Sequence, residues 1–145
     1  MAAVAKQAKT TSERQIRVVV IPSENDQITR PAGEALVAGD PIRPDATTGR
    51  WVKALGDTAP HAAITHIAWA TVAAGENVTG MRAFTADFLD LSGLAFGTKV
   101  YLSDTGTFDT VAGTVSTVVG EVVPAFATLL GTAADKLLDV MGFGH

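Results

Sequence analysis

Two stretches of the chain repeat one sequence pattern, and this repeat constrains the fold more than any other feature. Residues 33–51 read GEALVAGDPIRPDATTGRW, and residues 94–108 read LAFGTKVYLSDTGTF. In both stretches an apolar segment leads into a turn rich in Asp, Thr and Gly, and a second apolar segment follows. Asp caps its own backbone in such turns, and Gly supplies the positive φ that they need. The repeat therefore predicts two β-hairpins of one design.

The two stretches align when Gly39 is placed on Gly97, with one-residue slips further along. The alignment then makes the following pairs: Ile42 with Val100, Asp45 with Asp104, Gly49 with Gly106, and Trp51 with Phe108. Pro41 has no backbone N–H to donate, so it suits an edge strand or the first residue of a strand.

Short strands punctuated by Gly and Pro are predicted along the rest of the chain. The expected strands outside the hairpins are residues 16–21, 62–72, 75–84, 114–123, 125–130 and 136–141, and residues 88–91 form a short apolar stretch. A polar loop is expected at 23–29, a turn at 56–60 and a β-bulge at Gly80. Residues 87–95 and 132–139 are the only helix contenders, and both are short. This spacing predicts an all-β domain, a small antiparallel β-sandwich or β-barrel.

Composition restricts the function classes. The 145 residues suffice for one domain, and they contain no cysteine, so neither disulfides nor thiolate chemistry is expected. No apolar run is long enough to predict a membrane span. Charged residues make up only 18% of the chain, which hints that a partner covers part of the surface.

Charge is distributed unevenly along the sequence. Residues 1–17 carry Lys6, Lys9, Arg14 and Arg17 against Glu13, a net charge of +3, whereas the remainder carries −7. An acidic body argues against a nucleic-acid groove. Residues 1–15 lack aromatic residues and apolar periodicity, so they predict a flexible N-terminal arm that orders against a partner, with residues 16–145 forming the β-rich domain.

The sequence offers little catalytic chemistry. His61 and His66 are five residues apart, which on a strand places them on opposite faces and argues against a shared metal ion. The aspartates cluster at predicted turns, where they usually act as caps. Comparison with the trimeric dUTP pyrophosphatases finds no counterpart of their uridine-binding hairpin or Gly-rich tail. We therefore expect neither an enzyme nor a cofactor or metal site.

Three aromatic residues are the candidates for core or interface positions: Trp51, Trp69 and Phe108. Without exposed aromatics interleaved with basic residues, a stacking platform for single-stranded nucleic acid is not predicted. For Trp51 a sugar-stacking role remains the alternative to a core or interface role.

The hairpin motifs resemble those of the head decoration, or capsid cement, proteins of tailed phages. The resemblance covers about residues 30–123 and is carried by AGEALVAGDPIRPDATTGRWVKA, GLAFGTKVYLSDTGTFDTV and the later VGEVV. It implies a small, β-tulip-like β-sandwich or β-barrel, commonly a homotrimer, bound to the major capsid protein on the outer surface of the virion after synthesis in the host cytoplasm. It carries no catalytic residues. In such proteins an N-terminal arm often reaches the capsid lattice, so Lys6, Lys9, Arg14 and Arg17 are the candidate capsid contacts.

Two function classes therefore stand. The first is a virion structural protein that stabilises the head against the pressure of packaged DNA. The alternative is a carbohydrate- or receptor-binding β module on a virion or cell surface. Neither involves a membrane or direct contact with nucleic acid.

Overall fold

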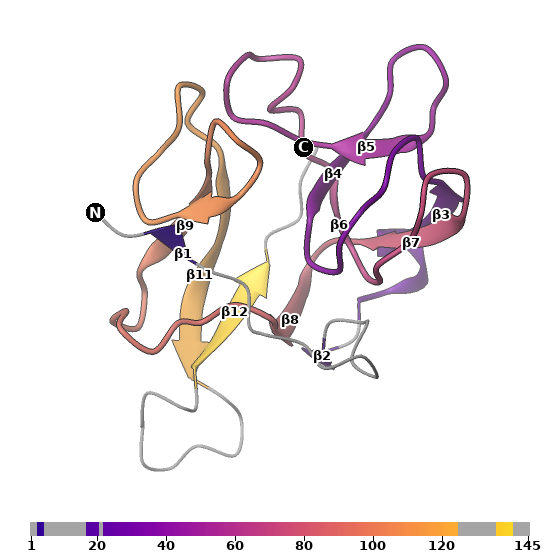
Figure 1. The fold of residues 1–145 in the computed structure, drawn as a ribbon. Coiled ribbons are helices and arrows are strands. Elements are labelled where there is room, and N and C mark those ends of the chain that lie inside the picture. Colours follow the sequence, from indigo (N-terminus) through magenta and orange to yellow (C-terminus); the bar gives the residue numbers. More distant parts are fainter. Residues whose placement is uncertain (1–2, 5–16, 21, 125–135, 141–145) are drawn as a thin grey trace.

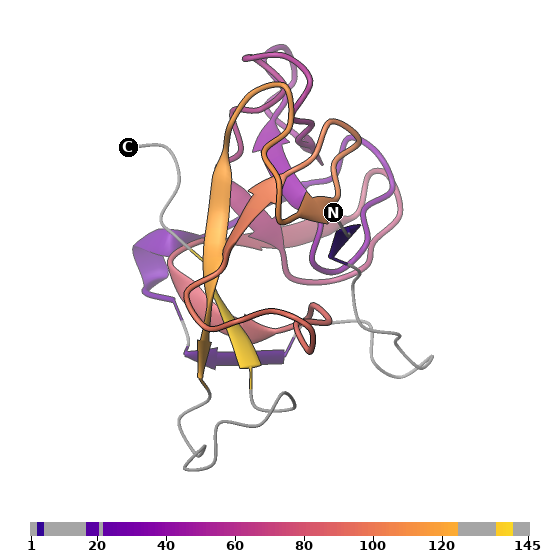
Figure 2. The same ribbon diagram turned by 90° about the vertical axis from the view of Figure 1, so that its left-hand side faces the viewer.

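Two antiparallel sheets form the molecule in the computed structural model, which describes residues 3–4, 17–20, 22–124 and 136–140 (Figure 1). The larger sheet has seven strands in the order β1-β10-β9-β11-β12-β8-β2. Their bounds are β1 Ala3–Val4, β2 Arg17–Val20, β8 Phe84–Asp87, β9 Lys99–Leu102, β10 Phe108–Asp109, β11 Val118–Pro124 and β12 Lys136–Val140. Figure 2 shows β11 and β12 running side by side through this sheet.

The smaller sheet has five strands in the order β3-β7-β6-β4-β5. Their bounds are β3 Gln27–Pro31, β4 Pro41–Pro44, β5 Trp51–Lys53, β6 His66–Ala68 and β7 Asn77–Met81. A single turn of 3₁₀ helix, η1 at Glu24–Asp26, precedes β3. The predicted all-β sandwich is confirmed, and the sheets do not close into a barrel.

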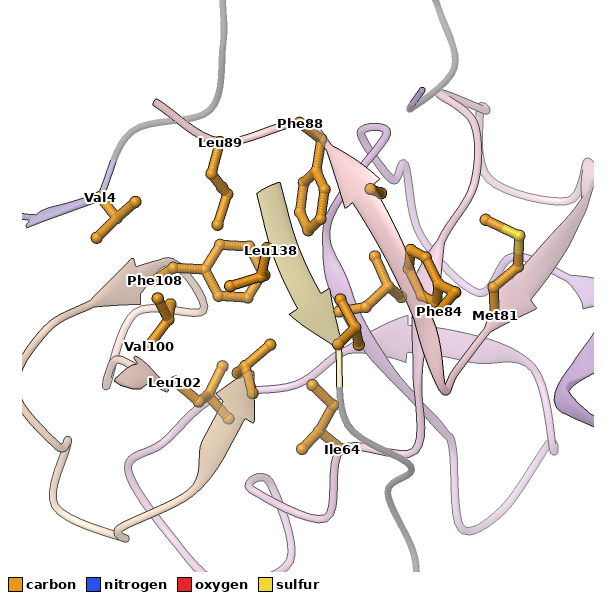
Figure 3. Packing of buried hydrophobic residues seen from close by; sticks show 14 of the residues in the cluster. Val4, Ile64, Met81, Phe84, Phe88, Leu89, Val100, Leu102, Phe108 and Leu138 are labelled. Carbon is orange, nitrogen blue, oxygen red and sulfur yellow. The ribbon is translucent and has the colours of Figure 1, made fainter. Parts of the chain in front are cut away.

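The main core lies between the two sheets and draws on both. Ile67 of β6 and Met81 of β7 contribute from the smaller sheet, and buried side chains of β8, β9 and β12 contribute from the larger one (Figure 3). A second, smaller cluster covers the opposite face of the five-stranded sheet. It consists of Ala32, Leu36, Ile42, Trp51, Ala68 and Val78. Strand β6 is thus buried on both faces, which explains why its sequence shows little polar alternation.

Both predicted hairpins are present, one in each sheet. In the first, β4 pairs with β5, and in the second, β9 pairs with β10. Gly49 and Gly106 occupy equivalent turn positions with φ of 71° and 81°. The structure explains the one-residue slip in the sequence alignment: Ser103, not Asp104, lies at the position equivalent to Asp45. The N–H of Gly49 donates to the carbonyl of Asp45, and that of Gly106 donates to the carbonyl of Ser103.

The two hairpins hold the sheets together where the first return strand ends. The N–H of Gly56 donates to the carbonyl of Ser103 at 2.8 Å, and its carbonyl accepts from the N–H of Val115 at 2.8 Å. A Cβ on Gly56 would lie 2.9 Å from the carbonyl oxygens of Leu102 and Ser103. A Cβ on Gly106 would lie 2.8 Å from Cδ2 of Leu55. The chain therefore needs glycine on both sides of this contact.

The edges of the five-stranded sheet meet at one point. A parallel bridge joins Ala32 to Trp51, and the N–H of Gly33 donates to the Trp51 carbonyl at 2.8 Å. One step further, the N–H of Lys53 donates to the carboxylate of Glu34 at 3.1 Å. The segment after β3 thus covers the outer edge of β5, and a side-chain oxygen takes the place of the next backbone acceptor.

Several sequence expectations about individual elements were wrong. The 62–72 segment is a strand only at His66–Ala68, and 114–123 becomes a strand only at Val118. The loop expected at 23–29 already contains the start of β3. Neither helix contender is helical where the structure describes it: residues 87–95 contain no helix, and residues 136–139 belong to β12. The strand expected at 125–130 lies outside the described residues.

The bulge expected at Gly80 is absent from the ladder between β3 and β7, which runs without a register shift from Gln27–Met81 to Pro31–Asn77. Glycine is present for a different reason. A Cβ at this position would lie 2.9 Å from Cβ of His66 and 3.0 Å from Cζ2 of Trp51. Gly80 therefore makes room for the ring of Trp51.

Candidate interaction surface

The start of the expected N-terminal arm lies on the sheet. Ala3–Val4 forms β1 and pairs with β10, with Val4 opposite Phe108. The side chain of Val4 is buried in the main core beside Leu89, Val100 and Phe108 (Figure 3). The expectation that residues 1–15 have nothing to dock on their own body is therefore wrong at Val4. Sequence reasoning missed this contact because one valine among alanines and lysines shows no periodicity.

The basic residues predicted to contact a capsid are placed only in part. Lys6, Lys9 and Arg14 lie outside the described residues. Arg17 is the first residue of β2, at the edge of the larger sheet opposite β1, and its backbone pairs with Asp87 of β8. The structure therefore gives no common position for these four residues.

The three aromatic candidates lie within or against the core. Phe108 is 1% exposed in the main cluster, and its ring meets that of Phe88 edge-on at a centroid separation of 6.0 Å. Trp69 is partly buried and packs against the same cluster. Trp51 is 1% exposed in the smaller cluster. Because a sugar needs an open ring face, Trp51 is not a sugar-stacking residue in this conformation.

Trp51 lies at the centre of a polar group that sequence reasoning did not anticipate. Its ring centroid lies 4.9 Å from that of His66, with the planes tilted by 54°. The guanidinium carbon of Arg30 lies 4.9 Å from the same indole centroid, which is cation–π geometry. The register places Arg30, Gly80, His66 and Trp51 on one face of the sheet. Their register partners are Val78, Ala68, Ile42 and Pro44 respectively, and alternate residues of a strand share a face.

His66 is buried in an environment that disfavours its protonated form. Burial, followed by repulsion from Arg82 and Arg30, lowers the pKa of His66 to about 4, with Asp26 opposing the shift. Its Nδ1 lies 2.9 Å from the hydroxyl of Thr65, and its Nε2 is buried without a hydrogen-bond partner. His66 is therefore neutral at pH 7. Its 4% exposure makes it a structural residue rather than a surface ligand.

Arg82 and Asp26 form an ion pair near this group, at the end where β3 begins and β7 ends. Nε of Arg82 lies 2.8 Å from the Asp26 carboxylate, and the Arg82 N–H also donates to the Asp26 carbonyl at 3.0 Å. A hydrogen bond from Ser23 and a second from Arg82 lower the pKa of Asp26. The Asp26 carboxylate therefore remains ionised at physiological pH, and its pairing with Arg82 fixes η1 against β7.

The second titratable pair lies on the surface. Nδ1 of His61 is 2.9 Å from the carboxylate of Asp57, and about two fifths of each side chain is exposed. The hydrogen bond to His61 lowers the pKa of Asp57. The sequence argument placed both histidines on one strand, but His61 lies in a turn and only His66 lies in a strand, β6. Within the described ranges, no group of three or more His, Asp or Glu side chains is arranged to hold a metal ion.

The tip of the second hairpin presents polar groups to solvent. The hydroxyl of Ser103 lies 2.7 Å from that of Thr107, and the carboxylate of Asp104 accepts from both the N–H and the hydroxyl of Thr114.

Three large apolar side chains are exposed on loops of the molecule: Val37 at 52%, Phe96 at 44% and Val111 at 45%. The Lys136 ammonium lies 5.4 Å from the Phe96 ring centroid. Such loops offer mixed polar and apolar contacts to a protein partner.

The sequence matches no protein-family model, and no curated protein shows significant similarity to it. None of the helical segments that the structure describes is long and apolar enough to cross a membrane.

Proposed function

We propose that this chain is a virion structural protein that binds the outer surface of a tailed-phage capsid, as a homotrimer in contact with the major capsid protein. In that role it stabilises the head against the outward pressure of packaged DNA. The proposal rests on the resemblance of residues 30–123 to head decoration proteins, together with the architecture of those residues.

One observation carries the proposal further than the sequence does. The motifs that bear the resemblance fold as two equivalent hairpins, one in each sheet, joined through Gly56 and Ser103. A protein that resists expansion of a shell must transmit load between its contacts without shearing internally. Backbone hydrogen bonds between the sheets, with no room for side chains at the contact, suit that demand.

The surface supplies contacts of the kind that such a partner needs. Loops from both sheets expose apolar side chains at Val37, Phe96 and Val111, although charged residues are few in the chain as a whole. The segment after β1 contains Lys6, Lys9 and Arg14, which would add electrostatic attraction to an acidic shell.

A binding assay tests the proposal directly. Heads assembled from the major capsid protein of the phage that encodes this chain, in unexpanded and expanded forms, would be mixed with the protein and sedimented. We expect saturable binding to expanded heads and a higher temperature of head disruption. A variant with Lys6, Lys9 and Arg14 changed to Gln should bind more weakly, and added salt should reduce the binding of the unaltered protein.

The matched control removes the same charge from the body by changing Arg50, Lys53 and Lys99 to Gln. Both triple variants have the same net charge, so a selective loss in the N-terminal variant assigns binding to that segment. Absence of binding to either form of the head would contradict the proposal. Binding to immobilised glycans in its place would favour the carbohydrate-binding alternative.

A further inference from the structure

The N-terminal strand occupies an acceptor site that any extended apolar segment could fill. Strand β10 contains only Phe108 and Asp109, and β1 covers its outer edge. Val4 enters the main core there at 6% exposure, beside Leu89, Val100 and Phe108 (Figure 3). Without β1, this edge would expose unpaired backbone groups and the side of the Phe108 ring. Such an edge binds a strand by main-chain hydrogen bonds and selects it by one side-chain pocket.

The strand that fills this site is tethered at the far side of the same sheet. β1 and β2 are the two edges of the seven-stranded order, with five strands between them. Six interstrand spacings amount to about 29 Å. The thirteen steps from Val4 to Arg17 reach at most about 43–47 Å when fully extended. Thirteen residue steps are therefore long enough for the width of the sheet.

The docked strand is also held by few contacts. Only two residues pair with β10, and Val4 is the only side chain before Arg17 that the described part of the chain places in the core. The ordering entropy of such a short strand offsets much of what one buried valine contributes. β1 therefore leaves its site more readily than any strand of the central ladder.

Charge complementarity makes a second copy of the chain a suitable donor. Residues 1–17 carry a net charge of +3 and the rest of the chain carries −7. The acceptor edge itself includes Asp109, which lies opposite Ala3, and the neighbouring turn includes the exposed Asp104. The basic segment is attracted equally to its own acidic body and to that of a neighbour.

We infer that β1 is exchanged between copies, so that Ala3–Val4 of one molecule docks on the β10 edge of another. The linkage is strand exchange, which requires no new surface because every copy carries both donor and acceptor. This inference does not depend on the proposed function, since it applies to the protein alone in solution.

Disulfide trapping tests the exchange, and the natural chain contains no cysteine to interfere. Ala3 and Asp109 are directly opposed in the register, so Ala3→Cys and Asp109→Cys would be prepared as separate proteins, the second with a longer tag. After mixing and mild oxidation, we expect a covalent heterodimer on non-reducing denaturing gels. Its yield should rise with protein concentration.

The control replaces Asp109→Cys by Thr48→Cys, which lies in the exposed turn of the other sheet. No heterodimer above background is expected from that mixture. Equal yields from both mixtures would reveal random collision and overturn the inference. A double Ala3→Cys/Asp109→Cys variant that closes entirely within one chain, with no heterodimer from the mixed single variants, would also overturn it. If neither the mixed single variants nor the double variant formed a disulfide, β1 would not lie against β10, and the inference would be overturned.

Discussion

At the scale of single residues, Trp51 is the largest fully buried side chain and determines its surroundings. His66 lies against its ring, Arg30 lies over its face, and Gly80 is small so that the ring fits. The sequence predicted a core or interface role for Trp51 from the hairpin pattern. It did not predict the neighbours, because they come from three other strands and only the sheet order brings them together.

Replacing Trp51 by alanine should lower the free energy of unfolding by about 3–5 kcal/mol, because a large buried ring is deleted and the cavity is lined by β-sheet that cannot collapse. Urea denaturation followed by circular dichroism would measure the loss. Trp69→Ala provides the matched control, since Trp69 is only partly buried and should cost distinctly less. Equal losses for the two variants would contradict this account of the smaller cluster.

Stability should also depend on pH through His66. Its pKa is about 4 in the folded state against 6.5 for the ordinary side chain, so the unfolded chain binds a proton first as pH falls. Stability is therefore unaffected by His66 above about pH 7, declines between about pH 6.5 and 4, and has lost on the order of 3 kcal/mol below that range.

The measurement is the free energy of unfolding of the native protein and of a His66→Gln variant at several pH values. The variant will be less stable at pH 7, because glutamine fits the site poorly, but its stability should change less between pH 6.5 and 4. Parallel pH profiles for the two proteins would show that His66 is not the group responsible.

At the scale of elements, the two hairpins follow from local sequence while most other boundaries do not. Their turns need a glycine with positive φ three or four residues after a polar side chain that accepts a backbone N–H, and the Asp/Ser/Thr/Gly composition of both stretches indicates this. Strand β6 and the start of β3 depend on partners distant in sequence. The 62–72 segment is apolar enough for a long strand, yet only His66–Ala68 forms one, and within it only Ile67 has a register partner on both sides.

The two turn glycines allow backbone strain to be separated from crowding. Gly49 and Gly106 have nearly the same φ, but a Cβ on Gly49 meets nothing within 4 Å, whereas one on Gly106 lies 2.9 Å from the Ala54 carbonyl oxygen. Gly49→Ala should therefore cost about 1 kcal/mol from the φ alone. Gly106→Ala should cost about 2–4 kcal/mol, since backbone of the other hairpin must also move.

Thermal unfolding of the two variants, measured side by side, gives the comparison. The difference between them estimates the cost of crowding the Ala54 carbonyl and the Leu55 side chain. If Gly106→Ala were no worse than Gly49→Ala, the two hairpins would not be packed closely at this point.

At the scale of the whole molecule, the proposed trimer is the feature that the chain's composition and surface support. Few charged residues and the three exposed apolar side chains leave surface that a second copy could cover. Size-exclusion chromatography with light scattering should give about three times the 15.0 kDa of the chain. A species of single-chain mass at micromolar concentration would contradict a trimer in solution.

The sequence predicted the fold class of the molecule but not the arrangement of its sheets. Repeated short strands were enough for an all-β sandwich. The order of the seven-stranded sheet places β1 and β2 at opposite edges although they are neighbours in sequence. Periodicity cannot reveal such long-range pairing, and for the same reason it could not reveal that Val4 belongs to the core.

The unpaired backbone groups at the edges of the five-stranded sheet determine whether crowded copies of the molecule can pair edge to edge. The hydrogen-bonded pairs Asp26–Arg82 and Ala32–Glu76 frame β3, so Gln27, Thr29 and Pro31 direct their backbone groups away from β7. Of these, proline has no N–H, and the N–H of Gln27 already donates to Glu24. At the other edge, the outward carbonyl of Trp51 accepts from the N–H of Gly33, and the outward N–H of Lys53 donates to the carboxylate of Glu34. Only Thr29 retains an outward N–H on β3, so this sheet is a poor template for fibril growth even where many copies are concentrated.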